Sequence, residues 1–169
     1  MIALPADAIA IGFGGNVGED DAIVERFDHA RGALQHLGAV RSAGLYRTAP
    51  IGPAQPPFLN TAVTVRVSEA TPSELLALLR ELERLLGRDR SREVRWGPRL
   101  IDLDLLLWGT RTLRTPELEL PHPRLAERKF VILPLIDLFG DELVVAGQSL
   151  AALRERVRDQ VADEIRTSW

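Results

Sequence analysis

The sequence contains no cysteine, only three histidines and a single lysine, Lys129, among its 21 basic residues. Because there is no thiol, the chain can form neither a disulfide nor a zinc–thiolate site, and it cannot use a cysteine nucleophile. No apolar run approaches the roughly 20 residues that a membrane-spanning helix needs. The first residues also lack the basic and apolar segments of a signal peptide. These absences predict a cytoplasmic protein with no membrane partner.

Two nucleotide-binding motifs are also missing. The sequence has no Gly-x-x-x-x-Gly-Lys-Ser/Thr, which excludes a Walker-type NTPase. Gly12, Gly14 and Gly15 do not form a dinucleotide fingerprint, because position 17 is Val17. The net charge of −3 argues against a general nucleic-acid binder. A length of 169 residues with 46% hydrophobic content predicts one domain, residues 1–169, with a real core.

Hydrophobic periodicity predicts strands at residues 9–13, 40–46, 58–67 and 101–108, and helices at 22–37, 71–86 and 149–161. A short partner strand is expected at Thr112 and Leu113, and the type of the apolar run 130–135 is left undecided. Proline-rich residues 49–57 and basic residues 88–98 are predicted to be long loops. The order indicates an α+β, ferredoxin-like α/β sandwich with a mainly antiparallel sheet and flanking helices. A doubly wound sheet is the alternative.

Asp102 and Asp104 alternate with leucines in the clearest predicted strand. Side chains alternate across a strand, so the two carboxylates share one face, with Cα atoms about 6–7 Å apart. Hard oxygen ligands select Mg²⁺, which takes one or two carboxylates together with substrate phosphate oxygens. A strand with one solvated face is the alternative for this pair considered alone.

The predicted loop before the aspartates and the residue that follows it carry five arginines, which favours the metal interpretation. A planar guanidinium donates two parallel hydrogen bonds to phosphate. Trp96 in the same loop can stack on a flat substrate. A cationic loop beside an acidic metal pair is typical of phosphoryl transfer. The five arginines are Arg88, Arg90, Arg92, Arg95 and Arg99.

Four ordered blocks resemble the 6-hydroxymethyl-7,8-dihydropterin pyrophosphokinase family of folate biosynthesis. Residues 95–104, Arg-Trp-Gly-Pro-Arg-Leu-Ile-Asp-Leu-Asp, are similar to its signature. Residues 14–16 resemble its Gly-Ser-Asn, residues 46–52 and 58–60 its second block, and residues 121–124 and 128–135 its last. The resemblance covers residues 9–138.

The resemblance implies that ATP gives its β,γ-diphosphate to the hydroxymethyl group of the dihydropterin and that AMP leaves. It implies that Asp102 and Asp104 hold two Mg²⁺ ions and act in catalysis with Arg88 and Arg99. The implied ATP contacts are Arg90, Arg95, Trp96, Arg99, Leu105, His122 and Arg128. The implied pterin contacts are Thr48, Ala49, Ile51, Phe58, Asn60, Trp96 and Phe130. No nucleic acid is implied, and we expect a monomer. The two long loops are expected to close over ATP as catalytic loops.

Some positions depart from the family pattern. The 90–95 segment is one residue longer than the commonest spacing, which leaves the register of its contacts open. Gly15 replaces a serine, Ala49 a frequent proline, and Glu117 and Glu119 stand where some members have nucleotide-contacting Arg and Thr. Two other functions remain alternatives: another metal-dependent phosphotransferase or nucleotidyltransferase, and a ligand-binding module without activity.

Overall fold

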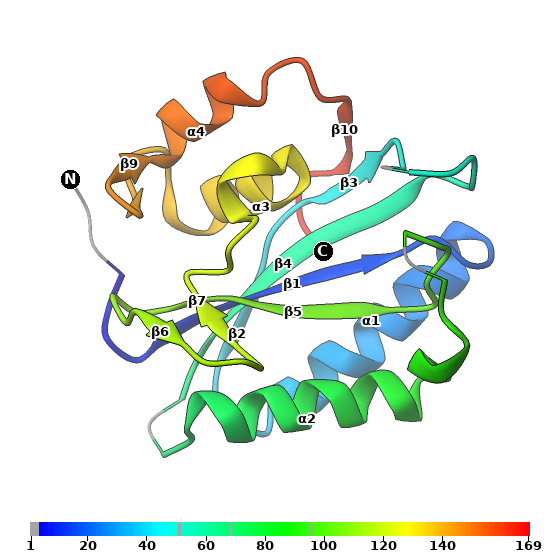
Figure 1. Cartoon of the computed structure of the whole chain (residues 1–169), viewed down its shortest axis with the longest axis horizontal. Helices are drawn as coiled ribbons and strands as arrows, with labels where there is room; N and C mark the ends of the chain where they lie inside the picture. The colour runs from blue at the N-terminus through cyan, green and yellow to red at the C-terminus, as the bar shows by residue number, and fades with distance from the viewer. Residues whose placement is uncertain (1–3, 51, 68, 95) are drawn as a thin grey trace.

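The computed structural model describes residues 4–50, 52–67, 69–94 and 96–169. Its centre is an antiparallel sheet with the strand order β10-β3-β4-β1-β5, in which β2 also pairs with β4 (Figure 1). The strands are β1 (Ala8–Gly15), β2 (Val40–Ser42), β3 (Leu45–Thr48), β4 (Phe58–Arg66), β5 (Asp102–Trp108) and β10 (Ala162–Arg166). This pairing confirms the ferredoxin-like fold and excludes a doubly wound parallel sheet.

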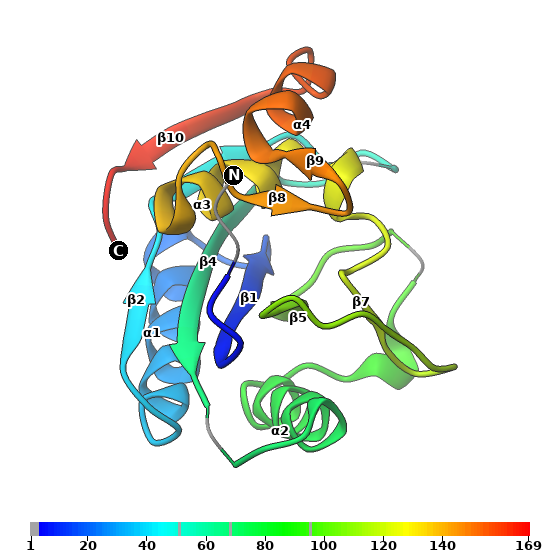
Figure 2. The same ribbon diagram turned by 90° about the vertical axis from the view of Figure 1, so that its left-hand side faces the viewer.

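Helices cover both faces of the sheet (Figures 1 and 2). Helices α1 (Asp20–Leu34) and α2 (Pro72–Leu85) lie on one face, and α3 (Lys129–Phe139) and α4 (Leu150–Arg156) lie on the other. The side chains of strand β1 alternate between the two faces of the sheet, so this strand contributes to the core on each side. Ile9, Ile11 and Phe13 enter the core under α1 and α2, whereas Ala8 and Ala10 face the core under α3 and α4.

Helix α2 begins as the sequence predicts. Thr71 caps it, Pro72 occupies the first turn, and Glu74 completes a capping box by accepting a hydrogen bond from the Thr71 backbone N–H at 2.8 Å. Leu75, Leu79 and Leu82 form its buried face.

Short elements complete the chain. Two hairpins pair β6 (Leu113–Arg114) with β7 (Glu119–Leu120) and β8 (Val144–Val145) with β9 (Gln148–Ser149). Two 3-10 turns, η1 (Arg90–Arg92) and η2 (Leu125–Glu127), precede β5 and α3 respectively. No helix within the described ranges has the length and apolar character needed to span a membrane.

Three predicted elements are corrected, and the undecided run is assigned. The expected strand 40–46 is two strands, β2 and β3, and the break falls at Ala43 and Gly44, where a β-carbon on Gly44 would lie 2.8 Å from the backbone oxygen of Arg166. The strand expected at residues 112–113 pairs with β7 and not with β5. The undecided run 130–135 is helical and contains Pro134. The last helix ends at Arg156, so Val161 lies outside it and is exposed.

Candidate active site

The candidate site lies where one end of the sheet meets the two long loops. The end of β1 lies between the beginnings of β4 and β5, because Gly14 pairs with both Asn60 and Asp102. A cavity of about 320 Å³ opens there. Its described lining consists of Gly12, Phe13, Gly14, Thr48, Ala49, Phe58, Asn60, Thr61, Trp96, Gly97, Arg99, Asp102, Asp104, Leu106, Arg124, Arg128, Phe130 and Val131.

Two glycines of β1 form the floor of this cavity. Gly12 and Gly14 continue the face of small residues begun by Ala8 and Ala10, and they pair with Asp104 and Asp102. A β-carbon on Gly12 would lie 3.2 Å from Leu106 Cδ1, and one on Gly14 would lie 3.1 Å from Asn60 Oδ1. The cavity therefore depends on the absence of side chains at these two positions.

One wall of the cavity is aromatic and amide-bearing. Phe58 and Phe130 line it from β4 and α3. The buried Asn60 donates from Nδ2 to Thr48 Oγ1 at 2.8 Å, which fixes its amide. Ala49 and Trp96 also line this space. The structure thus gathers the residues expected to bind the pterin, except Ile51, which lies outside the described residues.

The other wall is acidic. Asp102 and Asp104 both line the cavity, while Leu103 and Leu105 are buried in the core on the opposite face, as the alternation predicts. Burial disfavours ionised Asp102, but Arg88 and Arg99 outweigh it and lower its pKa below the ordinary value. Burial and the charge of Asp102 raise the pKa of Asp104 to about 7, although Arg128 opposes this rise. The two carboxylates therefore titrate in different pH ranges, Asp102 below its ordinary range and Asp104 near neutrality.

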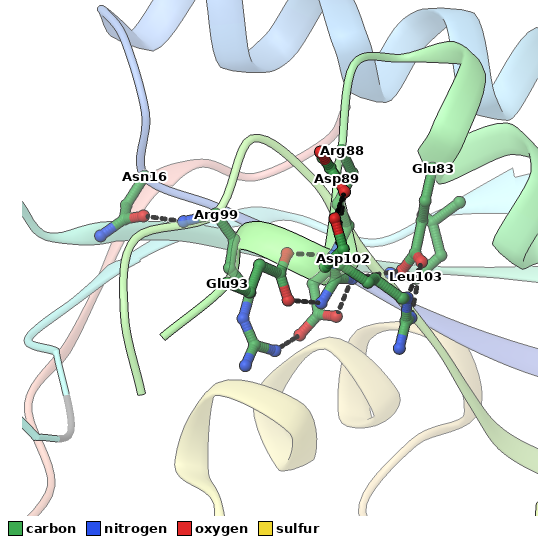
Figure 3. Close-up of polar contacts among 10 residues, drawn as sticks. Asn16, Glu83, Arg88, Asp89, Glu93, Arg99, Asp102 and Leu103 are labelled. Carbon is green, nitrogen blue, oxygen red and sulfur yellow. Dashed lines mark hydrogen bonds and ion pairs between the residues drawn. The ribbon is translucent and has the colours of Figure 1, made fainter. Parts of the chain in front are cut away.

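A network of ions surrounds Asp102 (Figure 3). Arg99 Nη1 donates to Asp102 Oδ2 at 2.8 Å. Arg88, whose side chain is 3% exposed, donates to Asp102 Oδ1, to Glu83 Oε1 and to Glu93. Burial lowers the pKa of Arg88, but hydrogen bonding to Glu93 and the charges of Asp102 and Glu83 outweigh it and hold the pKa above its ordinary value. Arg88 does not line the cavity; it lies behind Asp102.

Two further arginines reach the cavity from the segment before α3. The Arg124 guanidinium carbon lies 4.7 Å from the centroid of the Trp96 ring, and that of Arg128 lies 5.5 Å from the centroid of Phe130. Arg128 Nε is buried without a hydrogen-bond partner among the described residues. A buried N–H donor in this state suits an anionic ligand.

Asn16 joins the long loops to the end of β1. Its Oδ1 accepts from the Arg99 backbone N–H at 2.8 Å, and its Nδ2 donates to Gln55 Oε1 and to the Pro56 carbonyl, each at 3.0 Å. Gln55 in turn donates from Nε2 to the Trp96 carbonyl at 2.6 Å. We call Asn16 and Gln55 the loop latch.

The remaining expected ATP contacts lie elsewhere. His122 is outside the described cavity lining, and its Nδ1 accepts from the Arg124 backbone N–H at 3.2 Å. Burial, assisted by Arg128, lowers the pKa of His122 to about 4, so its ring is neutral. Arg90 pairs with Glu83 at 2.6 Å. The Leu105 side chain is buried in the core and is not among the described cavity lining, and Arg95 lies outside the described residues.

Sequence reasoning missed Glu83, Arg124 and the loop latch. Glu83 had a usable signal: it stands between Leu79 and Leu86 on the apolar side of α2, where a charge needs a buried partner. Arg124 gave no comparable local signal. Asn16 and Gln55 are recognisable only when the loops are seen together.

The donor set fits a hard divalent cation. Asp102 and Asp104 present carboxylates on one strand face beside the cavity, and Mg²⁺ in such sites takes one or two carboxylates and completes its shell with phosphate oxygens and water. The described residues contain no group of three or more His, Cys, Asp or Glu side chains that could hold a metal alone.

A ferredoxin-like sheet with paired carboxylates, cavity arginines and a flat-ring wall defines an enzyme that transfers phosphorus-containing groups. Residues 10–140 match the family described as 7,8-dihydro-6-hydroxymethylpterin-pyrophosphokinase (HPPK). The chain belongs to this family. It therefore acts in diphosphate transfer in folate biosynthesis, with ATP as co-substrate, and the alternative of a module without activity is excluded.

Individual relatives agree with this assignment. The chain is 37% identical over 154 residues to the 2-amino-4-hydroxy-6-hydroxymethyldihydropteridine pyrophosphokinase of Synechocystis, covering 87% of this chain and 74% of that protein. It is 40% identical over 132 residues to the Bacillus subtilis protein of the same name, covering 76% and 75%. It is also 40% identical to the mitochondrial folate synthesis bifunctional protein of Arabidopsis thaliana, covering 78% of this chain and 23% of that protein.

Solved structures support the fold. A Plasmodium falciparum HPPK-DHPS structure with pteroate superposes with a TM-score of 0.68 at 13% identity, covering 92% of this chain. The present chain spans 43% of that longer protein. At this identity the likeness concerns the fold alone.

Proposed function

We propose that this chain transfers the β,γ-diphosphate of ATP to the hydroxymethyl group of 6-hydroxymethyl-7,8-dihydropterin in a Mg²⁺-dependent reaction that releases AMP. One observation carries the proposal. A single cavity has an aromatic and amide wall suited to a flat heterocycle, and beside it a wall of two aspartates and three arginines suited to a triphosphate.

The pterin is held by the first wall. Phe58 and Phe130 contact the ring faces, and Asn60, oriented by Thr48, hydrogen-bonds its polar edge. The backbone around Ala49 adds contacts along the same edge. This arrangement directs the hydroxymethyl group toward Asp102 and Asp104.

The triphosphate is held by the second wall. Arg99 and Arg128 supply cationic donors, and the unpartnered Nε of Arg128 gains an acceptor when a phosphate oxygen binds. Asp102 and Asp104 would hold two Mg²⁺ ions. Bound there, Mg²⁺ would neutralise phosphate charge and lower the pKa of the reacting hydroxyl.

The chemical step needs little covalent participation by the protein. The hydroxymethyl oxygen forms a bond to the β-phosphorus, the bond from that phosphorus to the oxygen of the α-phosphate breaks, and the hydroxyl proton passes to water. Arg99 stabilises charge that develops on the transferred group, and Arg88 orients the Asp102 carboxylate from behind before the cation binds. The loop latch keeps the two loops over the cavity, which limits the access of bulk water to ATP.

We also infer that residues 1–169 form one catalytic domain that acts as a monomer. The support for one domain is that β1 and β10, near the two ends of the chain, belong to the same sheet. The support for a monomer is that the exposed large hydrophobics found among the described residues, Leu85, Val94 and Val161, lie on separate segments. Light scattering on the purified chain measures its molar mass in solution and so tests whether it is a monomer.

Product analysis tests the reaction. The protein is incubated with ATP, Mg²⁺ and the hydroxymethyl-dihydropterin, and the nucleotide product is identified. We expect AMP in equal amount to the dihydropterin diphosphate. Release of ADP or of inorganic pyrophosphate would contradict diphosphate transfer. Asp102→Asn and Asp104→Asn are expected to abolish turnover with the fold intact, and substantial activity in either variant would contradict the metal assignment.

A further inference from the structure

Glu83 is a buried carboxylate that the reaction as described does not use. It lies on α2, and its side chain is 2% exposed. Its Oε1 accepts from the backbone N–H of Leu103 at 2.8 Å and from Arg88 Nη1 at 2.5 Å. Its Oε2 accepts from Arg90 Nε at 3.0 Å and Nη2 at 2.6 Å. One carboxylate thus joins helix α2, the loop of residues 88–98, which we call the arginine loop, and strand β5 (Figure 3).

The contact with Leu103 places Glu83 directly behind the acidic pair. Leu103 stands between Asp102 and Asp104, and its side chain enters the core on the other face. Holding the Leu103 N–H therefore fixes the strand segment from which both carboxylates project. An acidic side chain that lies this close to two aspartates adds negative charge to the site and raises the pKa of Asp104 further.

The contact with Arg88 has a different consequence. The Arg88 guanidinium is shared among Glu83, Glu93 and Asp102. A cation that takes the carboxylate of Asp102 as a ligand competes with this guanidinium for it and weakens their contact. Because Arg88 is almost completely buried, leaving it without an anionic partner would be strongly unfavourable. Glu83 and Glu93 remain as its partners when the contact with Asp102 is weakened.

We propose that Glu83 is a positioning residue for the diphosphate transfer: it retains Arg88 when Asp102 turns to the metal, and it fixes the strand that carries both aspartates. This inference rests on the proposed function, because it assumes that the aspartates bind the cation. Glu83 is not among the described lining residues of the cavity, so it acts through Arg88 and through Leu103.

Cation binding, measured without turnover, tests the inference. Mn²⁺ is titrated by electron paramagnetic resonance into the whole chain in the presence of α,β-methylene-ATP, whose α–β linkage cannot be cleaved. We expect Glu83→Gln to weaken Mn²⁺ binding by about 10- to 100-fold, the range usual for residues that orient metal ligands. Glutamine keeps an acceptor for Leu103 but cannot neutralise Arg88.

A matched control separates positioning from net charge. Glu81 lies two residues earlier on α2, is half exposed and pairs with Arg84 at 2.7 Å. Glu81→Gln makes the same charge change on the same helix, and we expect Mn²⁺ binding like that of the wild type. An equal loss in Glu81→Gln and Glu83→Gln would overturn the inference, because a general field effect would then explain both.

A double-mutant cycle tests the route through Arg88. In the Arg88→Met background, Asp102 has no Arg88 to release, so Glu83→Gln should lower Mn²⁺ affinity much less than it does in the wild type. Fully additive losses would overturn the proposed route. In steady-state assays, Glu83→Gln should lower kcat and leave the KM for the pterin nearly unchanged, since the pterin wall lies on other elements. A rise in pterin KM with unchanged kcat would also overturn it.

Two further variants keep the outcome interpretable. If Glu83→Gln does not fold, Glu83→Asp retains the charge but shortens the reach, and wild-type Mn²⁺ binding by this variant would overturn the inference. Asp102→Asn reports on the proposed function itself. Loss of Mn²⁺ binding in Asp102→Asn with wild-type binding in Glu83→Gln rejects only the role of Glu83. Unchanged binding in Asp102→Asn rejects the metal site.

Discussion

At the scale of single residues, the ionised carboxylate of Asp104 makes folding less favourable. Its carboxylate is confined beside Asp102, and burial raises its pKa to about 7. A carboxyl whose pKa is higher in the folded state than in the unfolded chain favours folding less as the pH rises from 4 to 7. This unfavourable contribution of Asp104 to the folding free energy is fully present at pH 8, where the carboxyl is ionised in both the folded and the unfolded state.

We therefore expect Asp104→Asn to raise the Tm of the metal-free protein at pH 8 while abolishing activity. A gain of about 1–2 kcal/mol would raise the Tm by several degrees for a chain of this size. The gain should vanish near pH 4, where the wild-type carboxyl is protonated. Asp102→Asn is the contrasting control: the pKa of Asp102 is lowered by Arg88 and Arg99, so its removal should lower the Tm at pH 8. Calorimetry at both pH values measures these differences.

His122 should act on stability with the opposite sign. Its pKa falls to about 4 in the folded protein from an ordinary value of 6.5, so the unfolded chain binds more protons between these values. Stability contributed by neutral His122 is present above pH 6.5 and is lost as the pH falls toward 4. Compared with the wild type, His122→Asn should show a smaller loss of Tm over this window, because the amide oxygen can replace Nδ1 as acceptor for Arg124. His29→Asn, on the exposed side of α1, controls for loss of an imidazole. If the Tm of His122→Asn fell with pH as steeply as that of the wild type, the lowered pKa of His122 would be contradicted.

Some site residues could be predicted from the sequence because their signals are local. Asp102 and Asp104 sit in a strand whose alternation is complete over five residues, so one face had to be acidic. Glu83 could not be assigned a role in the same way. Its compensating partners Arg88 and Leu103 come from a loop and a strand, and only the packing of α2 against β5 brings them to it.

At the scale of elements, the two long loops depend on the loop latch. Gln55→Leu removes the hydrogen bond to the Trp96 carbonyl and the acceptor for Asn16 with little change in volume. We expect faster proteolysis within residues 88–98 and a rise in the KM for the pterin of several-fold, with a small change in Tm because the core is untouched. Gln148→Leu, in the distant β8–β9 hairpin, is the matched control. Protease resistance equal to that of the wild type would show that Gln55 does not hold the loop.

The helices and strands that the sequence did not predict share a cause, which is contact between distant parts of the chain. The predicted strand 40–46 breaks at Gly44 because the backbone of β10 approaches there from more than 100 residues away. The run 130–135 is apolar on all sides, so no period separates strand from helix. Its helix is capped by Gln160, whose Oε1 accepts from the Lys129 N–H at 2.9 Å. By contrast, α2 was predictable because its capping box lies within four residues.

At the scale of the whole molecule, ligand binding should stabilise both layers together. The cavity is lined by strands of the central sheet, by the arginine loop and by α3, so a bound nucleotide ties α3 to the sheet. At a concentration of 100 times Kd, binding adds about 2.7 kcal/mol, which corresponds to a Tm rise of roughly 5–10 °C for this size.

Thermal unfolding with Mg²⁺ and α,β-methylene-ATP measures this effect. We expect the rise in Tm to be lost when EDTA removes the metal, because phosphate binding at the aspartates requires a cation between the negative charges. Asp102→Asn should lose most of the rise as well. A rise that survives EDTA unchanged would show that the arginines alone bind the nucleotide.

The glycine floor of β1 also bears on inhibitor resistance. A resistance mutation commonly excludes an inhibitor by adding a side chain that the natural substrate can tolerate. At Gly12 and Gly14 an added β-carbon would crowd Leu106 and Asn60 at the cavity in which we propose that the substrate binds. We therefore expect a side chain added to this floor against an inhibitor to weaken substrate binding as well.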